Sequence, residues 1–266
     1  MNSKKIEIIK IGGSVITDKR NYKTLLTKNL ARIIEEISLS FDKSRIIIHG
    51  AGSFGHIVAK KYDIINGFKK TEQIKGIIKI REDMTELTKN IVRLLNEKNL
   101  KAISFQTSAI TFENQETRRI EIFVEPIKKA LEMDLIPVLS GDIIFSENRS
   151  FSIISGDQLI EVLTHFFEVE RVVFCSDIDG LLVYNEKNEQ LLIEEIEYNK
   201  IDTINIAKIK ETEKIDVTGE MNNKFNIIRK LSDKVNEVVL VNGLIEGRLR
   251  SVLNNEKTIC TKIINK

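Results

Sequence analysis

The stretch Ile6-Glu7-Ile8-Ile9-Lys10-Ile11-Gly12-Gly13-Ser14 decides the fold class. Its first six residues form a short, nearly continuous apolar run, which is typical of a strand buried in a parallel sheet. Two glycines end the run, and consecutive glycines after a strand let backbone N–H groups approach phosphate oxygens without a Cβ in the way. Lys10 can bring an ammonium group to the same place. A tight turn beside a solvated lysine is the alternative interpretation.

Strands and helices alternate along the rest of the chain. Apolar runs predict short strands at residues 45–49, 102–105, 136–139, 172–175 and 238–241. Helical spacing of apolar residues predicts helices at about 25–39, 71–96, 126–133 and 219–231, and then a final helix–strand pair. Segments 141–154 and 181–193 are each predicted to form a β-hairpin. This order predicts an α/β protein with a mainly parallel sheet covered on both faces.

The composition suits one globular chain with balanced charge. The 266 residues are 42% hydrophobic, which is ample for a packed core. We expect a single domain made of two lobes that share one sheet, with a boundary near residue 170. Lysine and arginine total 41 against 39 acidic residues, a net charge of only +2. A dedicated nucleic-acid binder usually shows a clear basic excess, so we expect no nucleic-acid partner.

The sequence indicates a cytoplasmic protein with no membrane partner. No run approaches the ~18 uninterrupted apolar residues of a membrane span. The first residues lead directly into a strand-like run and lack the pattern of a signal peptide. Cys175 and Cys260 lie far apart in apolar surroundings. A disulfide or thiol site is one interpretation; we expect small buried hydrophobic residues in a reducing cytosol.

A second glycine-rich turn follows the second predicted strand. Residues 49–56 read His-Gly-Ala-Gly-Ser-Phe-Gly-His and run directly into a helix. A helix N-terminus offers N–H groups and a positive dipole end to an anion. His56 is expected in the first turn, where it can hydrogen-bond a phosphate oxygen, or it is a surface histidine. The pattern is neither a Walker A loop nor a dinucleotide fingerprint.

Three more motifs lie where strands are predicted to end, the edge at which parallel sheets bind ligands. Ser140-Gly141-Asp142 is repeated as Ser155-Gly156-Asp157, and Asp157 opens a predicted helix. That carboxylate can cap the helix, hold lysine ammonium groups, or do both. Asp177 follows a strand in Ser-Asp-Ile-Asp-Gly, a loop that lacks the spaced ligands of a metal site. Lys224 follows a loop in the first turns of another helix. No zinc spacing exists, and we expect no metal ligands.

The order of these motifs resembles the amino acid kinase superfamily over essentially the whole chain. Residues 12–19, Gly-Gly-Ser-Val-Ile-Thr-Asp-Lys, and residues 49–56 are similar to those of the isopentenyl phosphate kinases within it. Fosfomycin kinases share a similar Gly-x-Phe-Gly-His element. The resemblance implies a three-layer α/β/α sandwich with β-hairpin excursions over 1–266. It places the phosphate acceptor on a lobe of about 1–170 and ATP on a lobe of about 171–266, and it implies a homodimer.

Carried over position by position, the resemblance also implies roles for individual residues. Those it implies for catalysis are Lys10, Lys19, His56, Asp157 and Lys224. Those for the acceptor phosphate are Ala51, Gly52, His56 and Gly156. Those for ATP are Lys10, Gly12, Gly13, Ser14, Gly52, Asp177, Gly219 and Lys224. Lys19 would stabilise charge on the transferred phosphoryl group, and Asp157 would orient Lys10 and Lys224. Mg²⁺ would arrive with the nucleotide.

The implied activity is ATP-dependent phosphorylation of isopentenyl phosphate to isopentenyl diphosphate, a step of isoprenoid precursor synthesis by an alternative mevalonate route. A kinase of fosfomycin or another small phosphonate or phosphate is the first alternative. A non-catalytic small-molecule sensor is the second, although such a sensor would be expected to have lost some of the charged residues. Glu220 replaces a glycine usual in the family, and Cys260 replaces another. An apolar pocket for the substrate tail is expected from Phe68, Ile77, Ile78, Arg81, Met84 and Ile154.

Overall fold

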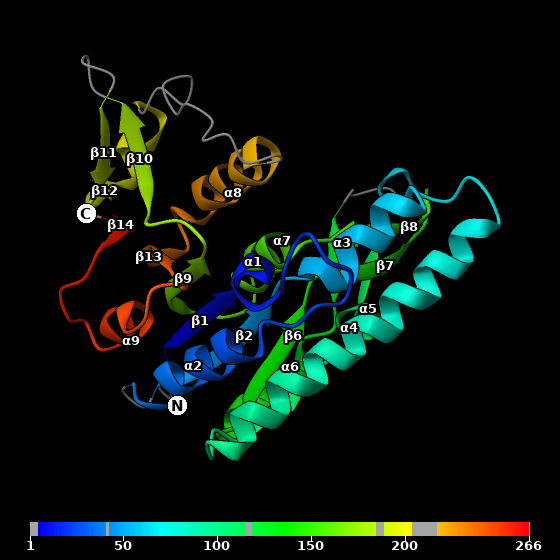
Figure 1. The fold of residues 1–266 in the computed structure, drawn as a ribbon, viewed down its shortest axis with the longest axis horizontal. Helices are drawn as coiled ribbons and strands as arrows, with labels where there is room; N and C mark the ends of the chain where they lie inside the picture. Colours follow the sequence, from blue (N-terminus) through cyan, green and yellow to red (C-terminus); the bar gives the residue numbers. More distant parts are fainter. Residues whose placement is uncertain (1–4, 41–42, 115–118, 185–188, 204–216, 266) are drawn as a thin grey trace.

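In a computed structural model of the protein, the motifs follow strands of one large sheet. The structure describes residues 5–40, 43–114, 119–184, 189–203 and 217–265, with the backbone only at 184, 202–203 and 217–223. Eight strands lie in the order β12-β14-β13-β9-β1-β2-β6-β3 (Figure 1). Their bounds are β1 (Ile6–Ile11), β2 (Ser44–His49), β3 (Ala102–Ser104), β6 (Ile136–Ser140), β9 (Val169–Ser176), β12 (Glu195–Glu197), β13 (Val235–Asn242) and β14 (Cys260–Ile264). Neighbouring strands are parallel except β13 and β14, so the predicted mainly parallel sheet is confirmed.

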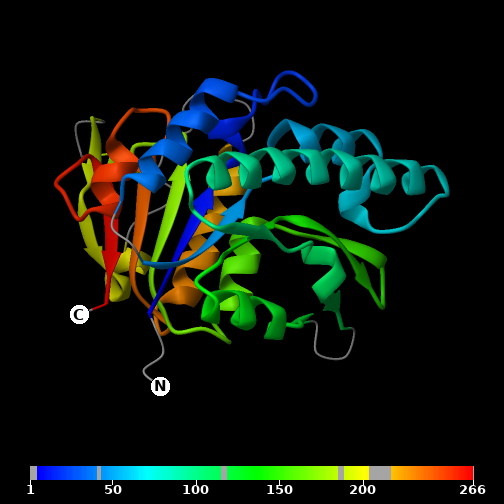
Figure 2. The same cartoon turned by 90° about the horizontal axis from the view of Figure 1, so that it is seen from below.

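Helices cover both faces of this sheet (Figure 2). Side chains of four helices join one buried cluster: α2 (Thr27–Ser38), α3 (Gly52–Lys61), α4 (Glu72–Glu97) and α9 (Arg248–Leu253). Side chains of three others join the second cluster: α6 (Glu125–Glu132), α7 (Gly156–Leu163) and α8 (Val217–Leu231). The three-layer sandwich is therefore confirmed. Each of the predicted long helices is present within about two residues of its expected bounds.

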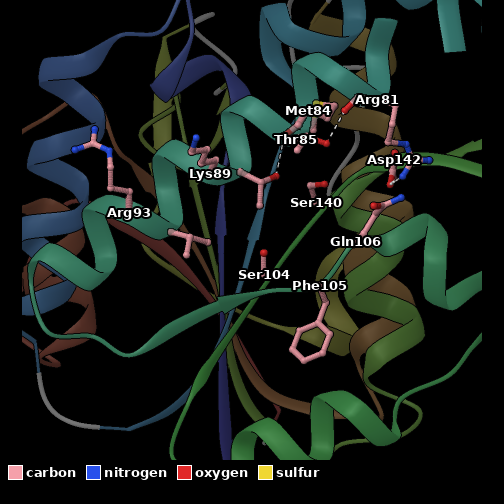
Figure 3. A pocket seen from close by; sticks show the side chains of 12 residues that line it. Arg81, Met84, Thr85, Lys89, Arg93, Ser104, Phe105, Gln106, Ser140 and Asp142 are labelled. Carbon is pink, nitrogen blue, oxygen red and sulfur yellow. Dashed lines mark hydrogen bonds and ion pairs between the residues drawn. The ribbon is translucent and has the colours of Figure 1, made fainter. Parts of the chain in front are cut away.

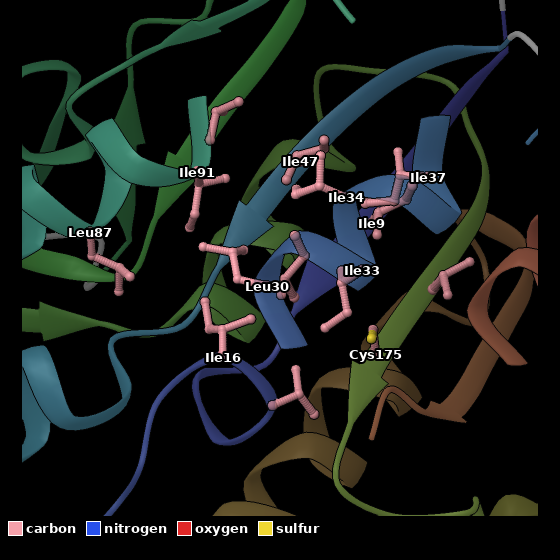
Figure 4. Packing of buried hydrophobic residues seen from close by; sticks show 14 of the residues in the cluster. Ile9, Ile16, Leu30, Ile33, Ile34, Ile37, Ile47, Leu87, Ile91 and Cys175 are labelled. Atoms are coloured by element: carbon pink, nitrogen blue, oxygen red, sulfur yellow. The ribbon is translucent and has the colours of Figure 1, made fainter. Parts of the chain in front are cut away.

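The alternation of side chains along β1 fixes which layer each residue meets. Ile9 and Ile11 pack with the α2 side, in the cluster shown in Figure 4, whereas Ile8 packs with α7 and α8. Because successive side chains point to opposite faces of a strand, Lys10 shares the face of Ile8. The strand therefore delivers Lys10 to the α7–α8 layer at its carboxyl end.

The buried Glu7 was not predicted to have a role. Its side chain is fully buried on the α2–α9 face, where Arg45 and Arg171 lie beside it on the neighbouring strands β2 and β9. Arg45 Nε and Arg171 Nε each donate to a Glu7 oxygen at 2.8 Å. A buried carboxylate needs such partners, so this charged row belongs to the structure of the sheet.

The two predicted hairpins are present outside the main sheet. β10 (Leu181–Tyr184) pairs antiparallel with β11 (Gln190–Ile193). β7 (Asp142–Ser146) and β8 (Ser150–Ile154) form the other hairpin, extended into four strands by β4 (Thr111–Glu113) and β5 (Ile120–Ile122). The sequence did not predict β4, β5 or the short α1 (Gly13–Ile16), α5 (Thr107–Ile110), η1 (Ile64–Asn66) and η2 (Tyr198–Thr203).

Two further expectations concern the cysteines and membranes. Cys175 and Cys260 are free, buried thiols, so the interpretation as small hydrophobic residues is confirmed. Within the described ranges, none of the helices combines the length and the apolar character that crossing a bilayer demands.

Candidate active site

A cavity of about 450 Å³ opens beyond the carboxyl ends of β1, β2 and β9. It brings together residues that the sequence places up to 214 positions apart, from Lys10 to Lys224. The predicted site residues that line it are Lys10, Gly12, Gly13, Ser14, Lys19, Ala51, Gly52, His56, Gly156, Asp157, Asp177 and Lys224. Gly219 and Glu220 lie in the first turn of α8, where the structure describes the backbone only.

The two glycine-rich turns pack directly against each other at the floor of the cavity. A Cβ on Gly13 would lie 2.4 Å from the Gly52 nitrogen. Gly52 has a φ of +49°, and a Cβ there would lie 2.0 Å from Oγ1 of Thr17. Both positions therefore require glycine, because no side chain fits between the turns.

The N–H groups of the first turn serve different purposes. Gly12 donates its N–H to the Cys175 carbonyl at 2.8 Å, so this group ties β1 to β9. Gly13 and Ser14 open α1, where backbone N–H groups precede the first hydrogen-bonded turn of the helix. These two N–H groups are the ones available to an anion.

Asp157 joins the two lysines that the sequence singled out. Lys10 Nζ lies 2.7 Å from one carboxylate oxygen, and Lys224 Nζ lies 3.1 Å from the other. Burial raises the pKa of Asp157, but the two ammonium groups outweigh it and lower the pKa to about 2. Lys224 also lies 4.6 Å from the centre of the Phe174 ring, a cation–π contact. The carboxylate thus holds two cations at fixed positions in the cavity.

Asp157 does not cap its helix, which corrects one of the interpretations left open above. Ser155 is the N-cap of α7: its side chain accepts from the Gln158 N–H at 3.1 Å, and Gln158 accepts from the Ser155 N–H at 2.9 Å. This is a capping box. Because the serine satisfies the helix end, the carboxylate two residues later is available to the lysines.

Lys19 and His56 line the same cavity as this pair. Lys19 Nζ is 3.7 Å from Asp177, which also accepts from the Ser14 hydroxyl at 2.9 Å. His56 is exposed and lines the cavity. Since α3 begins at Gly52, His56 lies in its second turn and not in the first, as the sequence had suggested.

The far end of the cavity is apolar. Ile80 and Met84 of α4 face Ile143, Ile153 and Ile154 of the β7–β8 hairpin. Four of the residues expected to form the apolar pocket lie elsewhere. Ile77 packs into the core, Ile78 is exposed, Phe68 lies against Phe151, and Arg81 points to a second cavity. Helical periodicity could not tell which side of α4 the hairpin would cover.

The second cavity lies on the other side of Met84 and Asp142, which line both (Figure 3). Arg81 donates to Asp142 and to the Ile143 carbonyl, each at 3.0 Å. Burial raises the pKa of Asp142, although Arg81 opposes the effect. The ion pair thus fixes Asp142 at the start of β7. The next residue, Ile143, lines the apolar end of the first cavity.

Among the residues that the structure describes, no group of three or more His, Cys, Asp or Glu side chains is placed to hold a metal ion. Cys260 begins β14 and is buried, away from the residues that line the cavity.

The fold and this cationic cavity define a class of small-molecule kinases: the sequence pattern described as "Amino acid kinase family" matches residues 5–248. An isopentenyl phosphate kinase of Methanothermobacter thermautotrophicus is 32% identical over 97% of this chain and 99% of its own. That of Methanocaldococcus jannaschii is 32% identical over 85% and 87%. The chain therefore belongs to the isopentenyl phosphate kinases of the amino acid kinase family.

Solved structures agree with this assignment. A crystal structure titled as isopentenyl phosphate kinase covers 97% of this chain with a TM-score of 0.80 and 28% identity. Another, titled as the substrate complex of an isopentenyl phosphate kinase, has a TM-score of 0.78 and 27% identity. A carbamate kinase from Giardia lamblia has a TM-score of 0.71 but 14% identity, and so shares the fold alone.

Proposed function

We propose that this chain catalyses the ATP-dependent phosphorylation of isopentenyl phosphate to isopentenyl diphosphate. One observation carries the proposal: a single cavity has a cationic end, with Lys10, Lys19 and Lys224, and an apolar end at Ile80 and Met84. A substrate with a phosphate head and a short hydrocarbon tail matches both ends. The names of the relatives support the same substrate.

In this proposal the two substrates bind to different lobes of the chain. The acceptor lies on residues of about 1–170, with its phosphate on Ala51, Gly52, His56 and Gly156 and its tail toward Ile80. ATP lies on residues of about 171–266, where Asp177, Gly219 and Lys224 contact it. The phosphates of ATP reach the turn of Gly12, Gly13 and Ser14, where the backbone N–H groups of Gly13 and Ser14 contact phosphate oxygens. Lys10 lies between the two phosphate positions.

The residues of this site align two anions and neutralise their charge. An oxygen of the acceptor phosphate forms a bond to the γ-phosphorus, the bond from that phosphorus to the bridging oxygen breaks, and ADP leaves. The attacking oxygen is already ionised, so the step needs no protein base. Lys10, Lys224 and Lys19 stabilise the charge that develops on the transferred group. We propose that Mg²⁺, carried by the nucleotide, neutralises further phosphate charge when bound.

A substrate panel tests this proposal. The purified chain is assayed with ATP and Mg²⁺ on isopentenyl phosphate, dimethylallyl phosphate, fosfomycin, acetylglutamate and UMP, with ADP release and product mass as readouts. We expect the highest kcat/KM on isopentenyl phosphate. Turnover confined to fosfomycin would favour the alternative kinase, and ligand binding without any turnover would favour a sensor. Either result would overturn the proposal.

We further propose a homodimer. The outer side of α4 exposes Ile74 and Ile78, one turn apart, at 44% and 54%. Neighbouring exposed apolar side chains on a helix favour pairing with another copy. Light scattering after size exclusion measures the mass directly. We expect twice the chain mass for the wild type and a monomer for Ile78→Glu.

We also propose that the enzyme works in the cytoplasm, in isoprenoid precursor synthesis. The free, buried thiols of Cys175 and Cys260 fit a reducing compartment. The proposed product is an isoprenoid diphosphate.

A further inference from the structure

The loop that carries Lys19 is fastened to α4 by a buried carboxylate. This loop joins α1 to α2, and its residues Tyr22 and Lys23 reach Asp83. The Tyr22 hydroxyl donates to Asp83, and Lys23 Nζ lies 3.2 Å from the same side chain. Lys79, one turn earlier on α4, adds a third contact at 3.0 Å. The side chain of Asp83 has no exposed surface, so three partners converge on a desolvated charge.

The same stretch of loop is held a second time, by Ser53 in the first turn of α3. Lys23 donates its N–H to the Ser53 carbonyl at 3.2 Å, and Thr24 donates its N–H to the Ser53 hydroxyl at 3.1 Å. Ser53 in turn donates its N–H to the Thr17 hydroxyl at 3.0 Å. Lys23 has a φ of +53°, a conformation that a lysine rarely adopts. The contacts on both sides hold the loop in this shape.

The loop is short and internally bonded between these anchors and Lys19. Asp18 donates its N–H to the Thr24 carbonyl at 2.9 Å, which closes the loop at its base. The Asp18 carboxylate accepts from the Arg20 N–H at 3.0 Å and so fixes the turn around Lys19. A displacement of Tyr22 and Lys23 would therefore move Lys19, whose ammonium group lines the cavity.

We propose that Asp83 is a positioning residue that holds the Lys19 ammonium group over the transferred phosphoryl group. Asp83 lies next to Met84, which lines the apolar end of the cavity, so one turn of α4 would both contact the acceptor and set the position of Lys19. This inference rests on the proposed function. Although burial raises the pKa of Asp83, its hydrogen bonds from Tyr22, Lys79 and Lys23 lower it overall. The group is therefore a carboxylate at neutral pH, and asparagine removes its charge with little change of shape.

Steady-state kinetics of Asp83→Asn and Tyr22→Phe test the proposal. We expect kcat to fall about tenfold to a hundredfold in Asp83→Asn, and less in Tyr22→Phe, since small misplacements of a catalytic group have such effects. KM for both substrates should stay within about twofold, because Asp83 lines neither substrate position in the cavity. Tyr22→Phe removes only the hydroxyl that donates to Asp83 and keeps the test open should Asp83→Asn fail to fold.

A double-mutant cycle separates positioning from a general structural role. If Asp83 acts through Lys19, then Lys19→Ala combined with Asp83→Asn should be no slower than Lys19→Ala alone. Glu36→Gln is the matched control: Glu36 is buried and ion-paired with Arg32 but lies outside the cavity. It should lower the melting temperature and leave kcat unchanged.

The outcomes distinguish this inference from the proposed function. A wild type inactive on isopentenyl phosphate contradicts the proposed function. An active wild type with an unchanged kcat in folded Asp83→Asn, or with additive losses in the cycle, overturns the positioning role alone. A loss of kcat in Glu36→Gln that matches its loss of stability would also overturn it, since stability would then explain both variants.

Discussion

Lys10 and Asp157 form an ion pair of 2.7 Å at the carboxyl end of β1, although 146 residues separate them in the chain. The same carboxylate holds Lys224 at 3.1 Å. Two ammonium groups that repel each other are thus kept close together by one carboxylate, whose side chain is only 14% exposed. Any phosphate that enters the cavity meets cations that are already in position, which is the main requirement of phosphoryl transfer.

Replacing Asp157 with asparagine should therefore disorganise both lysines. We expect kcat/KM to fall by about 10²-fold or more, the scale of losing a positioned charge-stabilising group. Both KM and kcat should change, because the proposed role has the lysines contact the substrates throughout the reaction. The control is Asp233→Asn, a residue of the turn after α8 that lines neither cavity. Wild-type kinetics for Asp157→Asn would contradict the proposed role.

The pH dependence of stability should report the same ion pairs. The pKa of Asp157 is about 2 in the folded chain and near 3.8 ordinarily, so unfolding takes up a proton between these values. The stabilisation is complete above about pH 4 and is lost as the pH falls toward 2. Its size is about 2 kcal/mol from the difference of nearly two pKa units.

Chemical denaturation of the wild type and Asp157→Asn between pH 6 and 2 measures this contribution. The difference in unfolding free energy between them should shrink below about pH 4. Burial lowers the pKa of His49 from 6.5 to about 4. His49 therefore destabilises the folded state as the pH falls from 6.5 toward 4, before Asp157 begins to titrate and equally in both proteins. A difference that stays constant down to pH 2 would argue against the ion pairs.

The sequence predicted the sheet and most of the cavity for identifiable physical reasons. The run from Ile6 to Ile11 has isoleucine side chains on both faces, interrupted by Glu7 on one and Lys10 on the other, and this pattern predicts a buried parallel strand. Glycine turns at strand ends then had to meet at one edge of the sheet, which brought Gly13 and Gly52 together. Lys10 could be placed because the alternation of the strand decides its face.

Other features depend on contacts that no local pattern encodes. Asp83 looks like an ordinary solvent-facing residue in a helix with many charges, and only the fold brings Tyr22 and Lys23 to it. Ser155 and Asp157 are both good caps, and the choice between them follows from the lysines that reach the aspartate. Short strands such as β4 carry too few residues to show a period.

His56 should bind the acceptor phosphate rather than the nucleotide. We expect His56→Ala to lower kcat/KM for isopentenyl phosphate by about 10²-fold, the effect of removing one positioned donor. KM for ATP should change little. His165→Ala is a suitable control, because His165 is an exposed histidine after α7 that lies outside the cavity. Equal losses of kcat/KM for isopentenyl phosphate and for ATP would contradict a role of His56 in binding the acceptor phosphate.

Lys19 should act mainly in the transition state. It lies beside Asp177 and half exposed in the structure, so its contact with the transferred group is expected to tighten only as the reaction proceeds. Lys19→Ala should lower kcat with little change in either KM, and single-turnover measurements can separate chemistry from product release. Lys28→Ala, on the exposed side of α2, serves as the control. A rise in KM without a loss of kcat would assign Lys19 to ground-state binding.

Gly52 should tolerate no side chain because its turn is in contact with the turn of Gly13 and with Thr17. Gly247 serves as a control that separates this steric effect from backbone strain. Gly52 and Gly247 both have positive φ, +49° and +81°, so alanine is strained at either position. A Cβ at Gly247 has nothing within 4 Å, whereas a Cβ at Gly52 would lie 2.0 Å from the Thr17 hydroxyl. Gly247→Ala should therefore cost about 1–2 kcal/mol from backbone strain alone. Gly52→Ala should cost more and abolish activity, because the turn that faces the phosphates must move. Urea denaturation with kinetics on both variants measures the difference, and equal costs with retained activity in Gly52→Ala would show that the two turns need not touch.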